Sequence, residues 1–387
     1  MPDMTLSSRG LIEKLVSFDT TSRESNLALI DFVAGYLDDL GVKSTLIHDA
    51  DRRKANLWAT IGPDDVGGVV LSGHTDVVPV DGQAWDTDPF KVAERDGCLF
   101  GRGTSDMKSF VAGALAAAPS FASQRLKTPV HFAFSYDEEV GCLGIGGIIG
   151  HINAGGQKPR LVIVGEPTAM QVVDAHKGVF TVNTVVEGLE AHSSAPDDGV
   201  NAVQIAADLV GRLNDLRRDL SVPDLCDPRF DPPYSSIQVG TIHGGTARNI
   251  IPRSCEFAWA IRPLPGVDVR PHFDRWVAGI ERDVVPAMRA VHPACCVRHR
   301  MGPVVLALSP DPGSAAEALA FKLTGANRSL AVSYAAEAGA FQAAGIPTVL
   351  CGPGDIAQAH KPNEFIALDQ VAAAEKFMAD LLVELRS

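Results

Sequence analysis

Short runs of apolar residues, each long enough for one buried strand, recur along the chain. Turn residues bound each run, and several of its positions are β-branched or aromatic, which is typical of strands in a sheet core. The four clearest runs are 68–74, 130–135, 161–166 and 348–352. Helical periodicity occupies two amphipathic segments in the first forty residues and the segments 107–120, 142–153 and 367–385. Strands that alternate with helices predict an α/β fold, with a mostly parallel sheet covered by helices on both faces.

The middle of the chain has a different pattern. Apolar and polar residues alternate there in part, which predicts strands, and these strands group with further helical segments. Strands are expected at 178–187, 235–242 and 253–262, and helices at 200–219 and 267–289. This grouping indicates a separate α+β unit inserted into the first domain. We therefore expect one domain made of residues 1–177 and 300–387, and a second made of residues 178–299.

Composition and charge exclude several classes of partner. The chain has 387 residues, of which 46% are hydrophobic and 21% charged, so it can bury the cores of two domains. Its net charge of -13 argues against nucleic acid and anionic membranes, which attract basic surfaces. No segment approaches the roughly 18 uninterrupted apolar residues of a membrane span. We expect no nucleic-acid partner and no membrane partner.

The cysteines and the N-terminal segment bear on location in the cell. Seven cysteines without CxxC spacing indicate small buried thiols in a reducing compartment, and not disulfides or a cysteine zinc site. The first residues, MPDMTLSSRG, lack the basic start and apolar run of a secretory signal. A cytoplasmic location is expected.

Acidic residues and histidines follow the predicted strands at their C-terminal ends. In an open α/β sheet, that edge is where ligands bind. Imidazole and carboxylate ligands together suit zinc, cobalt or manganese better than calcium or magnesium. One carboxylate can bridge two ions roughly 3.5–4 Å apart, which leaves room for a shared water. The sequence therefore predicts a centre for two divalent metal ions, zinc being favoured, formed from His74, Asp76, Asp106, Glu138, Glu139, Glu166 and His360.

Each of these residues alone has a simpler explanation. A histidine at a strand end is often structural, adjacent acids are usually a solvated turn, and Asp106 could cap the helix that follows it. Their recurrence at five strand ends favours a common site. Within that site Asp76 lies two residues after His74, so it is expected to hydrogen-bond the imidazole. The adjacent Glu138 and Glu139 suggest one metal ligand and one proton carrier.

With these residues assembled, the sequence resembles the metal-dependent aminoacylase and carboxypeptidase family. The metal motifs specify the family, and AHKG, IRPLPG and QAHKPNEF favour its acetylornithine branch. The matching segments run through both predicted domains in family order, at 72–90, 101–108, 136–141, 164–168, 175–178, 192–202, 242–252, 261–266 and 351–365.

The resemblance implies a role for each residue of the metal centre. Asp106 would bridge the two ions, and the peptide bond that follows it would be cis. One ion would be held by His74 and Glu166, and the other by Glu139 and His360. Asp76 would orient His74, and Glu138 would be the general base. The implied fold is a zinc-peptidase-like catalytic domain with an inserted dimerisation or lid domain.

The resemblance also implies how a substrate binds. His192, from the partner subunit of a homodimer, would polarise the scissile carbonyl. Asn249 and Arg262 would hold the polar end of the substrate, since an arginine fork suits a carboxylate. Glu337 would meet a positively charged amine or form a structural salt bridge. Ala335 and Ala336 precede it where relatives carry polar or thiol residues, which leaves the preferred amino acid open.

The implied activity is removal of the acetyl group from N2-acetyl-L-ornithine, a step of arginine biosynthesis. Relatives of the same family act on other N-acyl amino acids, so a succinyl-diaminopimelate desuccinylase, a general aminoacylase and a carboxypeptidase remain alternatives. A metal-stabilised binding protein without catalysis is an alternative of a different class. A serine or cysteine hydrolase is disfavoured, because the sequence contains no GxSxG motif and its cysteines have no partner motif.

Overall fold

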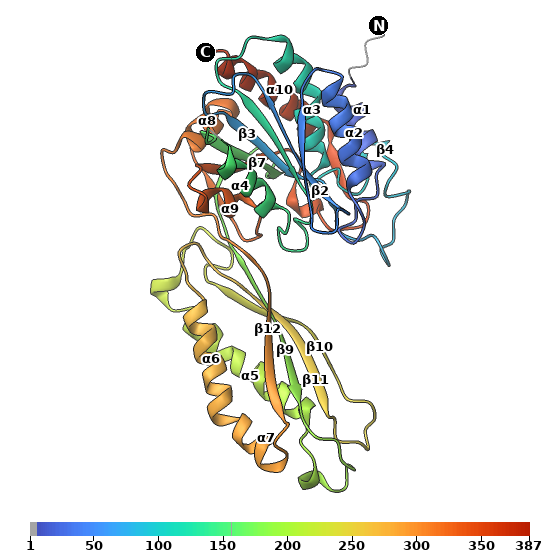
Figure 1. The fold of residues 1–387 in the computed structure, drawn as a ribbon, viewed down its shortest axis with the longest axis vertical. Coiled ribbons are helices and arrows are strands. Elements are labelled where there is room, and N and C mark those ends of the chain that lie inside the picture. The colour runs from blue at the N-terminus through green and yellow to red at the C-terminus, as the bar shows by residue number, and fades with distance from the viewer. Residues whose placement is uncertain (1–5, 156) are drawn as a thin grey trace. The chain divides into compact units, whose positions relative to one another are not determined.

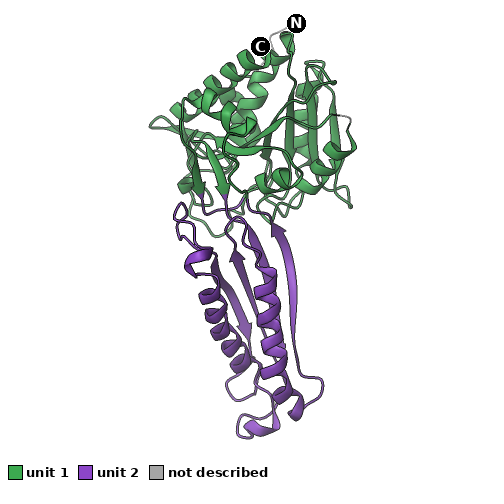
Figure 2. Cartoon of the chain, turned by 90° about the vertical axis from the view of Figure 1, so that its left-hand side faces the viewer, with its two compact units in different colours: residues 1–175, 308–331, 336–387 green, residues 176–307, 332–335 purple. Residues whose placement is uncertain are grey.

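The chain forms two compact units in the computed structural model, which describes residues 6–155 and 157–387. Unit 1 comprises residues 1–175, 308–331 and 336–387, and unit 2 comprises 176–307 and 332–335 (Figure 2). The sequence predicted an inserted segment of 178–299. In the structure the segment extends further, because residues 300–305 belong to a strand that pairs inside unit 2.

Unit 1 is built on an eight-stranded sheet in the order β1-β2-β6-β3-β7-β14-β8-β13. Its four central strands, β6, β3, β7 and β14, are parallel, as their continuous apolar runs predict. The pairs β1–β2, β2–β6 and β14–β8 are antiparallel, so the sheet is mixed toward its edges. The strands are β1 (Ser44–His48), β2 (Ala55–Ile61), β3 (Val69–His74), β6 (Val130–Ser135), β7 (Leu161–Pro167), β8 (Val173–His176), β13 (Leu330–Val332) and β14 (Thr348–Gly352).

Side chains alternate along β3 and thereby separate the two faces of this sheet. Leu71 lies in the core cluster with Phe110 of α3, whereas Ser72 points to the other face and bonds Glu337 at the start of α9. Helices therefore cover both faces, as the sequence predicts (Figure 1). Among the described residues, no helix is both long and apolar enough to cross a membrane. The helices of unit 1 are α1 (Ser8–Val16), α2 (Leu27–Asp38), α3 (Lys108–Ser123), α4 (Ile145–Ala154), α8 (Ala315–Thr324), α9 (Ala338–Ala343) and α10 (Leu368–Leu385).

A small second sheet joins two distant segments of unit 1. It has the order β15-β5-β4, from β4 (Ala93–Arg95), β5 (Cys98–Phe100) and β15 (Phe365–Ala367). Phe365 pairs with Phe100, and the two rings lie 5.2 Å apart between centroids. This pairing brings the residues just before β15 alongside the turn that follows β5.

Unit 2 is an α+β unit with a four-stranded antiparallel sheet in the order β10-β11-β9-β12. The inner face of the sheet, including Phe257 and Trp259 of β11, packs on the apolar faces of α5 and α6 in a separate core. Polar residues alternate onto the other face, which bounds a cavity of about 540 Å³. The elements are β9 (Val179–Glu187), α5 (Ala202–Asp219), β10 (Ser236–Gly244), β11 (Ser254–Arg262), α6 (Arg270–Asp283), α7 (Val285–Val291) and β12 (Cys296–Val305).

Candidate metal centre

The parallel strands of unit 1 place the sequence-predicted acids and histidines at one edge of the sheet. His74 is the last residue of β3, and Glu166 lies near the end of the neighbouring β7. Glu139 follows β6, and His360 follows β14 after a single 3-10 turn. The carboxyl ends of parallel strands meet at one edge, which is why residues so far apart in the chain converge there.

Four of these side chains lie within hydrogen-bond or ion-pair distance of one another. Asp106 Oδ1 lies 3.0 Å from His74 Nε2, and Asp106 Oδ2 lies 3.4 Å from His360 Nε2. His360 Nε2 is also 2.9 Å from Glu139 Oε2. Ligand atoms of His74, Asp106 and Glu139 all lie within 4.8 Å of one another. Donors about 2 Å from a shared ion lie within roughly 4 Å of each other, so this spacing suits a metal pocket.

Glu166 supplies a buried oxygen that needs a partner. Its side chain is only 4% exposed, and its Oε1 atom has no hydrogen-bond partner among the described residues. Neighbouring negative charge on Asp106 and Glu138 adds to the cost of its ionised form. A buried carboxylate oxygen without a partner is costly unless a cation or proton meets it. This atom is the clearest sign that the cluster is built to hold a cation.

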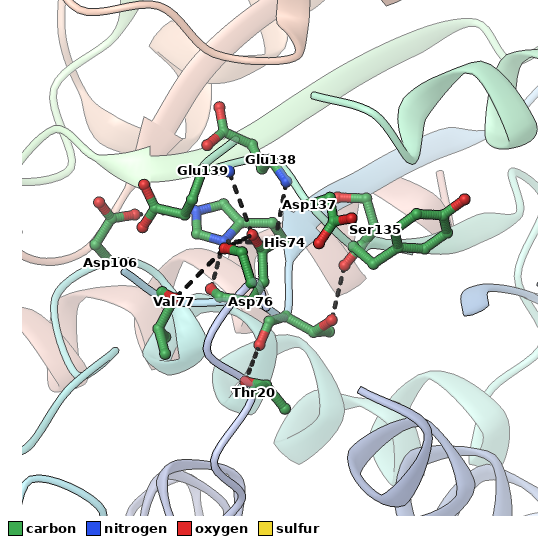
Figure 3. Close-up of polar contacts among 12 residues, drawn as sticks. Thr20, His74, Asp76, Val77, Asp106, Ser135, Asp137, Glu138 and Glu139 are labelled. Atoms are coloured by element: carbon green, nitrogen blue, oxygen red, sulfur yellow. Dashed lines mark hydrogen bonds and ion pairs between the residues drawn. The ribbon is translucent and has the colours of Figure 1, made fainter. Parts of the chain in front are cut away.

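Asp76 organises the site through both its main chain and its side chain (Figure 3). Its backbone carbonyl accepts the Nδ1 proton of His74 at 2.9 Å, whereas its carboxylate is 3.6 Å from that nitrogen. The carboxylate accepts instead from the backbone N–H groups of Glu138 and Glu139, at 3.1 and 3.3 Å, and from Ser22 Oγ at 2.7 Å. Asp76 thus fixes the Nδ1–H tautomer of His74 and the path of the glutamate loop.

The two adjacent glutamates point in different directions. The carboxylate of Glu139 is directed toward Asp106, and that of Glu138 leaves the loop in another direction (Figure 3). Asp137 precedes them with a positive φ of 55° and forms an ion pair with Lys54. The thiol of Cys142 lies 3.4 Å from Glu138 Oε1. One carboxylate therefore faces the metal pocket while its neighbour remains outside the cluster of ligand atoms.

Burial and mutual proximity shift the pKa values of the cluster in opposite directions. Hydrogen bonds to Asp106 and Glu139 raise the pKa of His360 to about 10. Burial would raise the pKa of Asp106, but hydrogen bonds from the two histidines lower it below its usual range. Burial raises the pKa of Glu139 to about 6 and that of Glu138 well above its ordinary value. Groups with such perturbed pKa values gather at functional sites, where a bound cation replaces protons.

The turn that carries Asp106 has special backbone geometry. The Asp106–Met107 peptide bond is cis, as the resemblance implies. Gly103 has a φ of 87°, a conformation that glycine adopts without strain. Lys108 is buried and donates to the carbonyl of Phe18, and burial lowers its pKa to about 7.

Glu337 lies beneath the edge of the sheet and is 1% exposed. Its two oxygens accept hydrogen bonds from Ser72 and Ser135, each at 2.9 Å. Its partners in the structure are therefore hydroxyl groups and not the salt-bridge partner that the sequence allowed. Binding of a substrate amine by this residue stays a prediction.

The three substrate residues expected in unit 2 do not lie together within one chain. His192 pairs with Ile250 across an isolated bridge, and the Ser193 N–H donates to the Asn249 carbonyl at 3.1 Å. This pair of loops adjoins the start of β11, whereas Arg262 is the last residue of that strand. Nine residues of strand span roughly 27 Å. Asn249 and Arg262 of one chain are thus too far apart to hold the same small molecule.

Several residues of the site were not singled out by the sequence, although three of them lie in segments that resemble the family. Gln83, Arg102 and Glu364 form a hydrogen-bond network beside Asp106 and His360, in which Arg102 and Glu364 are buried, although each of the three lies outside the predicted strands and helices. The position of Glu364, directly before the three apolar residues of β15, was the only feature that could have marked it as buried. Ser22 and Cys142 also contact the site, and single hydroxyl and thiol groups are too common for their pattern to indicate this.

Comparison with known proteins relates the chain to one family. The sequence matches the family described as Peptidase family M20/M25/M40 over residues 70–384. It is 32% identical over 382 residues to an acetylornithine deacetylase of Pasteurella multocida strain Pm70, covering 95% of this chain and 93% of that protein.

Solved structures share the fold. An M20 family metallo-carboxypeptidase from Sulfolobus solfataricus superposes with a TM-score of 0.77 at 18% identity, covering 98% of this chain and 99% of the other. A dinuclear metal-binding peptidase of the M20 family from Bacillus subtilis superposes with a TM-score of 0.65 at 15% identity, covering 98% and 97%.

Proposed function

The chain belongs to the peptidase family M20/M25/M40, and from this premise we propose that it removes the acetyl group from N2-acetyl-L-ornithine, giving L-ornithine and acetate. Membership makes the protein a metal-dependent hydrolase of amide bonds. The observation that carries the finer proposal is the convergence of His74, Asp106, Glu139 and His360 beside the unpartnered oxygen of Glu166. The name of the Pasteurella relative supplies the substrate. A role in arginine biosynthesis follows from that substrate.

The residues of the site fit two divalent ions, and zinc suits this mixture of imidazole and carboxylate best. Asp106 has both oxygens directed at histidines, one at His74 and one at His360, as a bridging carboxylate requires. Asp106 would hold one ion together with His74 and Glu166, and the other ion together with Glu139 and His360. Cobalt and manganese tolerate the same ligands and are the alternatives.

Glu138 is the proposed general base. When bound, the metal ions supply a water of lowered pKa and polarise the acyl oxygen. Glu138 accepts a proton from the attacking water and returns it to the nitrogen of the leaving amine. Burial raises the pKa of Glu138 well above its ordinary value, which suits a group that must take and return a proton near neutral pH. The Cys142 thiol donates to the carboxylate of Glu138, and the Asp76 carboxylate accepts from the backbone N–H of Glu138.

His192 is the proposed donor to the carbonyl oxygen of the substrate. Its Nδ1 accepts the Ser194 N–H at 3.2 Å, so the neutral ring carries its proton on Nε2. Because His192 and Asn249 lie at the opposite end of β11 from Arg262, one substrate can meet all three only if two chains contribute. We therefore infer a homodimer through unit 2 in which the partner provides His192. Arg262 would bind the α-carboxylate.

The experiment that tests the proposal couples metal analysis to turnover. Protein reconstituted with zinc, cobalt or manganese is assayed on N2-acetyl-L-ornithine, its N2-succinyl and N2-formyl analogues, N-succinyl-LL-diaminopimelate, and a dipeptide. The expected result is two ions per chain and the highest kcat/KM on the acetyl substrate. Preference for the diaminopimelate compound would favour a desuccinylase, and preference for the dipeptide would favour a carboxypeptidase. No metal-dependent release of amine from any of them would favour a non-catalytic binding protein.

A further inference from the structure

The carboxylate of Glu364 is surrounded by backbone donors of the turn that carries Asp106. Its Oε1 atom accepts from the N–H groups of Gly103, Ser105 and Asp106, at 3.0, 2.8 and 3.0 Å. The side chain is 1% exposed. Three N–H donors on one carboxylate oxygen are charge-assisted hydrogen bonds, which are stronger than those to neutral acceptors. The direction of the Asp106 backbone therefore depends on a glutamate more than two hundred residues away in the sequence.

Arg102 ties Glu364 to the segment that carries His360. Its Nη1 atom donates to Glu364 Oε2 at 2.6 Å and to the carbonyl of Lys361 at 3.2 Å. Like Glu364, the arginine is 1% exposed. Its planar fork can meet several acceptors at once, which a lysine could not do with the same geometry. One guanidinium thus spans the turn before α3 and the loop after β14.

Gln83 completes the connection. Arg102 Nη2 donates to Gln83 Oε1 at 2.6 Å, and Gln83 Nε2 donates to the carbonyl of His360 at 3.0 Å. Trp85 also donates to Gln83 Oε1, at 3.1 Å, and its ring lies 5.1 Å from the Arg102 guanidinium. The amide of Gln83 is therefore fixed on both sides.

His360 is the residue that most needs such support. It has a φ of 63°, in the left-handed region that non-glycine residues rarely adopt, and its side chain is 54% exposed. It therefore gains less from packing than His74, which is 1% exposed at the end of a central strand. Holding its backbone carbonyl is a way to fix the direction of its imidazole.

We propose that Glu364, Arg102 and Gln83 are positioning residues that hold Asp106 and His360 at the spacing a pair of metal ions requires. This inference rests on the proposed metal centre. A buried ion pair contributes little net stability, because its desolvation offsets its attraction. Apart from the bond to the Gln83 side chain, the bonds that Arg102 and Glu364 make outside their ion pair end on the backbone of the Asp106 turn and of Lys361, and Gln83 in turn bonds the His360 carbonyl. Partners that orient metal ligands typically change metal affinity 10- to 100-fold when removed.

The two arms of the network predict different metal losses. Glu364→Gln removes the charge that orders the Asp106 turn, and Asp106 would touch both ions, so both should bind about 10- to 100-fold more weakly. Gln83→Leu removes the support of His360 and one acceptor of Arg102, but it leaves the bonds of Glu364 to the Asp106 turn in place. The ion beside Glu139 and His360 should therefore weaken more than the other ion. Affinity and stoichiometry are measured by competition with a chelator, and the visible spectrum of the cobalt-loaded protein reports the ligand geometry.

The chain offers a matched control for the loss of a buried carboxylate. Glu317 is 8% exposed and accepts from the Gly313 N–H at 2.7 Å and Ser329 Oγ at 3.1 Å, with no bond to a predicted metal ligand. Glu317→Gln should leave both affinities and the cobalt spectrum unchanged. Thermal unfolding of each variant checks the fold, and Gln83→Leu, at a partly exposed position, tests the inference if Glu364→Gln does not fold.

The outcomes separate this inference from the proposed function. Wild-type protein that binds no metal would overturn the metal centre itself. The positioning role alone would be overturned if the wild-type protein binds two ions and the folded Glu364→Gln or Gln83→Leu variant has the same two metal affinities as Glu317→Gln.

Discussion

Oε2 of Glu139 lies 2.9 Å from Nε2 of His360, so side chains from two distant sequence segments of unit 1 form an ion pair at the edge of the sheet. Both groups are proposed ligands of the same ion. Hydrogen bonds to Asp106 and to Glu139 raise the pKa of His360 to about 10, and the histidine is therefore protonated at neutral pH when no cation is bound. A cation must displace that proton in order to use the nitrogen as a ligand.

Metal affinity should consequently rise with pH. Because His360 stays protonated until the pH approaches 10, each increase of one pH unit in the range below 10 should strengthen metal binding about tenfold for this proton. Isothermal titration of zinc into the chelator-treated protein, in two buffers of different ionisation enthalpy, counts the protons released. His360→Asn should weaken binding and release about one proton fewer. An affinity that does not change between pH 6 and 9 would contradict this assignment.

Glu138→Gln should separate catalysis from metal binding. The substitution keeps the size of the side chain but removes the proton acceptor, so kcat should fall by about 10²- to 10⁴-fold, the usual contribution of a general base. Both ions should remain, as measured by elemental analysis. Glu139→Gln is the matched variant, and it should lose metal as well as activity. Loss of metal in Glu138→Gln and retention in Glu139→Gln would mean that the two roles are exchanged.

Glu166→Gln should change stability in opposite directions with and without metal. Burial raises the pKa of Glu166 well above the ordinary 4.5. Above pH 4.5 the unfolded chain therefore releases a proton that the folded metal-free protein retains, and this difference lowers the stability of the folded state. Glutamine removes this cost, and the Tm of the chelator-treated variant should exceed that of wild type by a few degrees at pH 8. The difference should vanish as the pH falls toward 4. With zinc present, wild type should be the more stable of the two.

The central strands could be predicted because each is buried on both faces and therefore reads as one apolar run. β3 and β14 agree with the prediction within one residue. The edge strands could not be recognised in the same way. β1 is only partly buried along its length, and β13 has three residues, so neither carries an apolar run of the length that predicts a buried strand. β1 and β13 were missed for that reason.

The candidate site was predictable where its residues follow strands, and unpredictable where tertiary contacts alone define them. His74 and Glu166 end strands, so their convergence follows from the parallel sheet. The environment of Glu364 depends on the pairing of β15 with β5, a contact between distant segments. The backbone carbonyl of Asp76 that meets His74 was also unpredictable, because residue spacing describes side chains only.

The two serines around Glu337 should be coupled energetically. Each donates to a carboxylate that is 1% exposed, so removing either hydroxyl leaves a buried oxygen without its donor. Ser72→Ala and Ser135→Ala should each lower the free energy of unfolding by about 1–3 kcal/mol. The loss of unfolding free energy in the double variant should differ from the sum of the two single losses, because both hydrogen bonds are made to one carboxylate. Urea denaturation measures all three values. Exposed Ser123→Ala is the control and should have little effect.

Complementation between inactive variants tests whether His192 acts across a dimer. His192→Ala should lose about 10²- to 10³-fold in kcat, since it removes one donor to the developing oxyanion. Glu138→Gln is inactive for a different reason, the loss of the base. If the partner provides His192, a mixed dimer contains one site with an intact Glu138 and an intact His192. Random mixing by unfolding and refolding should then restore about a quarter of wild-type activity.

A histidine that acts within its own chain gives the opposite result. Each chain of the mixed dimer would then lack one of the two groups at its own site, and the mixture would be no more active than the variants alone. Mixing His192→Ala with Asn249→Ala provides the control. Both side chains belong to the same pair of loops, so a mixed dimer still lacks one of them at every site and activity should stay low. Recovery in the first mixture and not in the second would assign His192 and Asn249 together to the partner of the chain that provides Glu138.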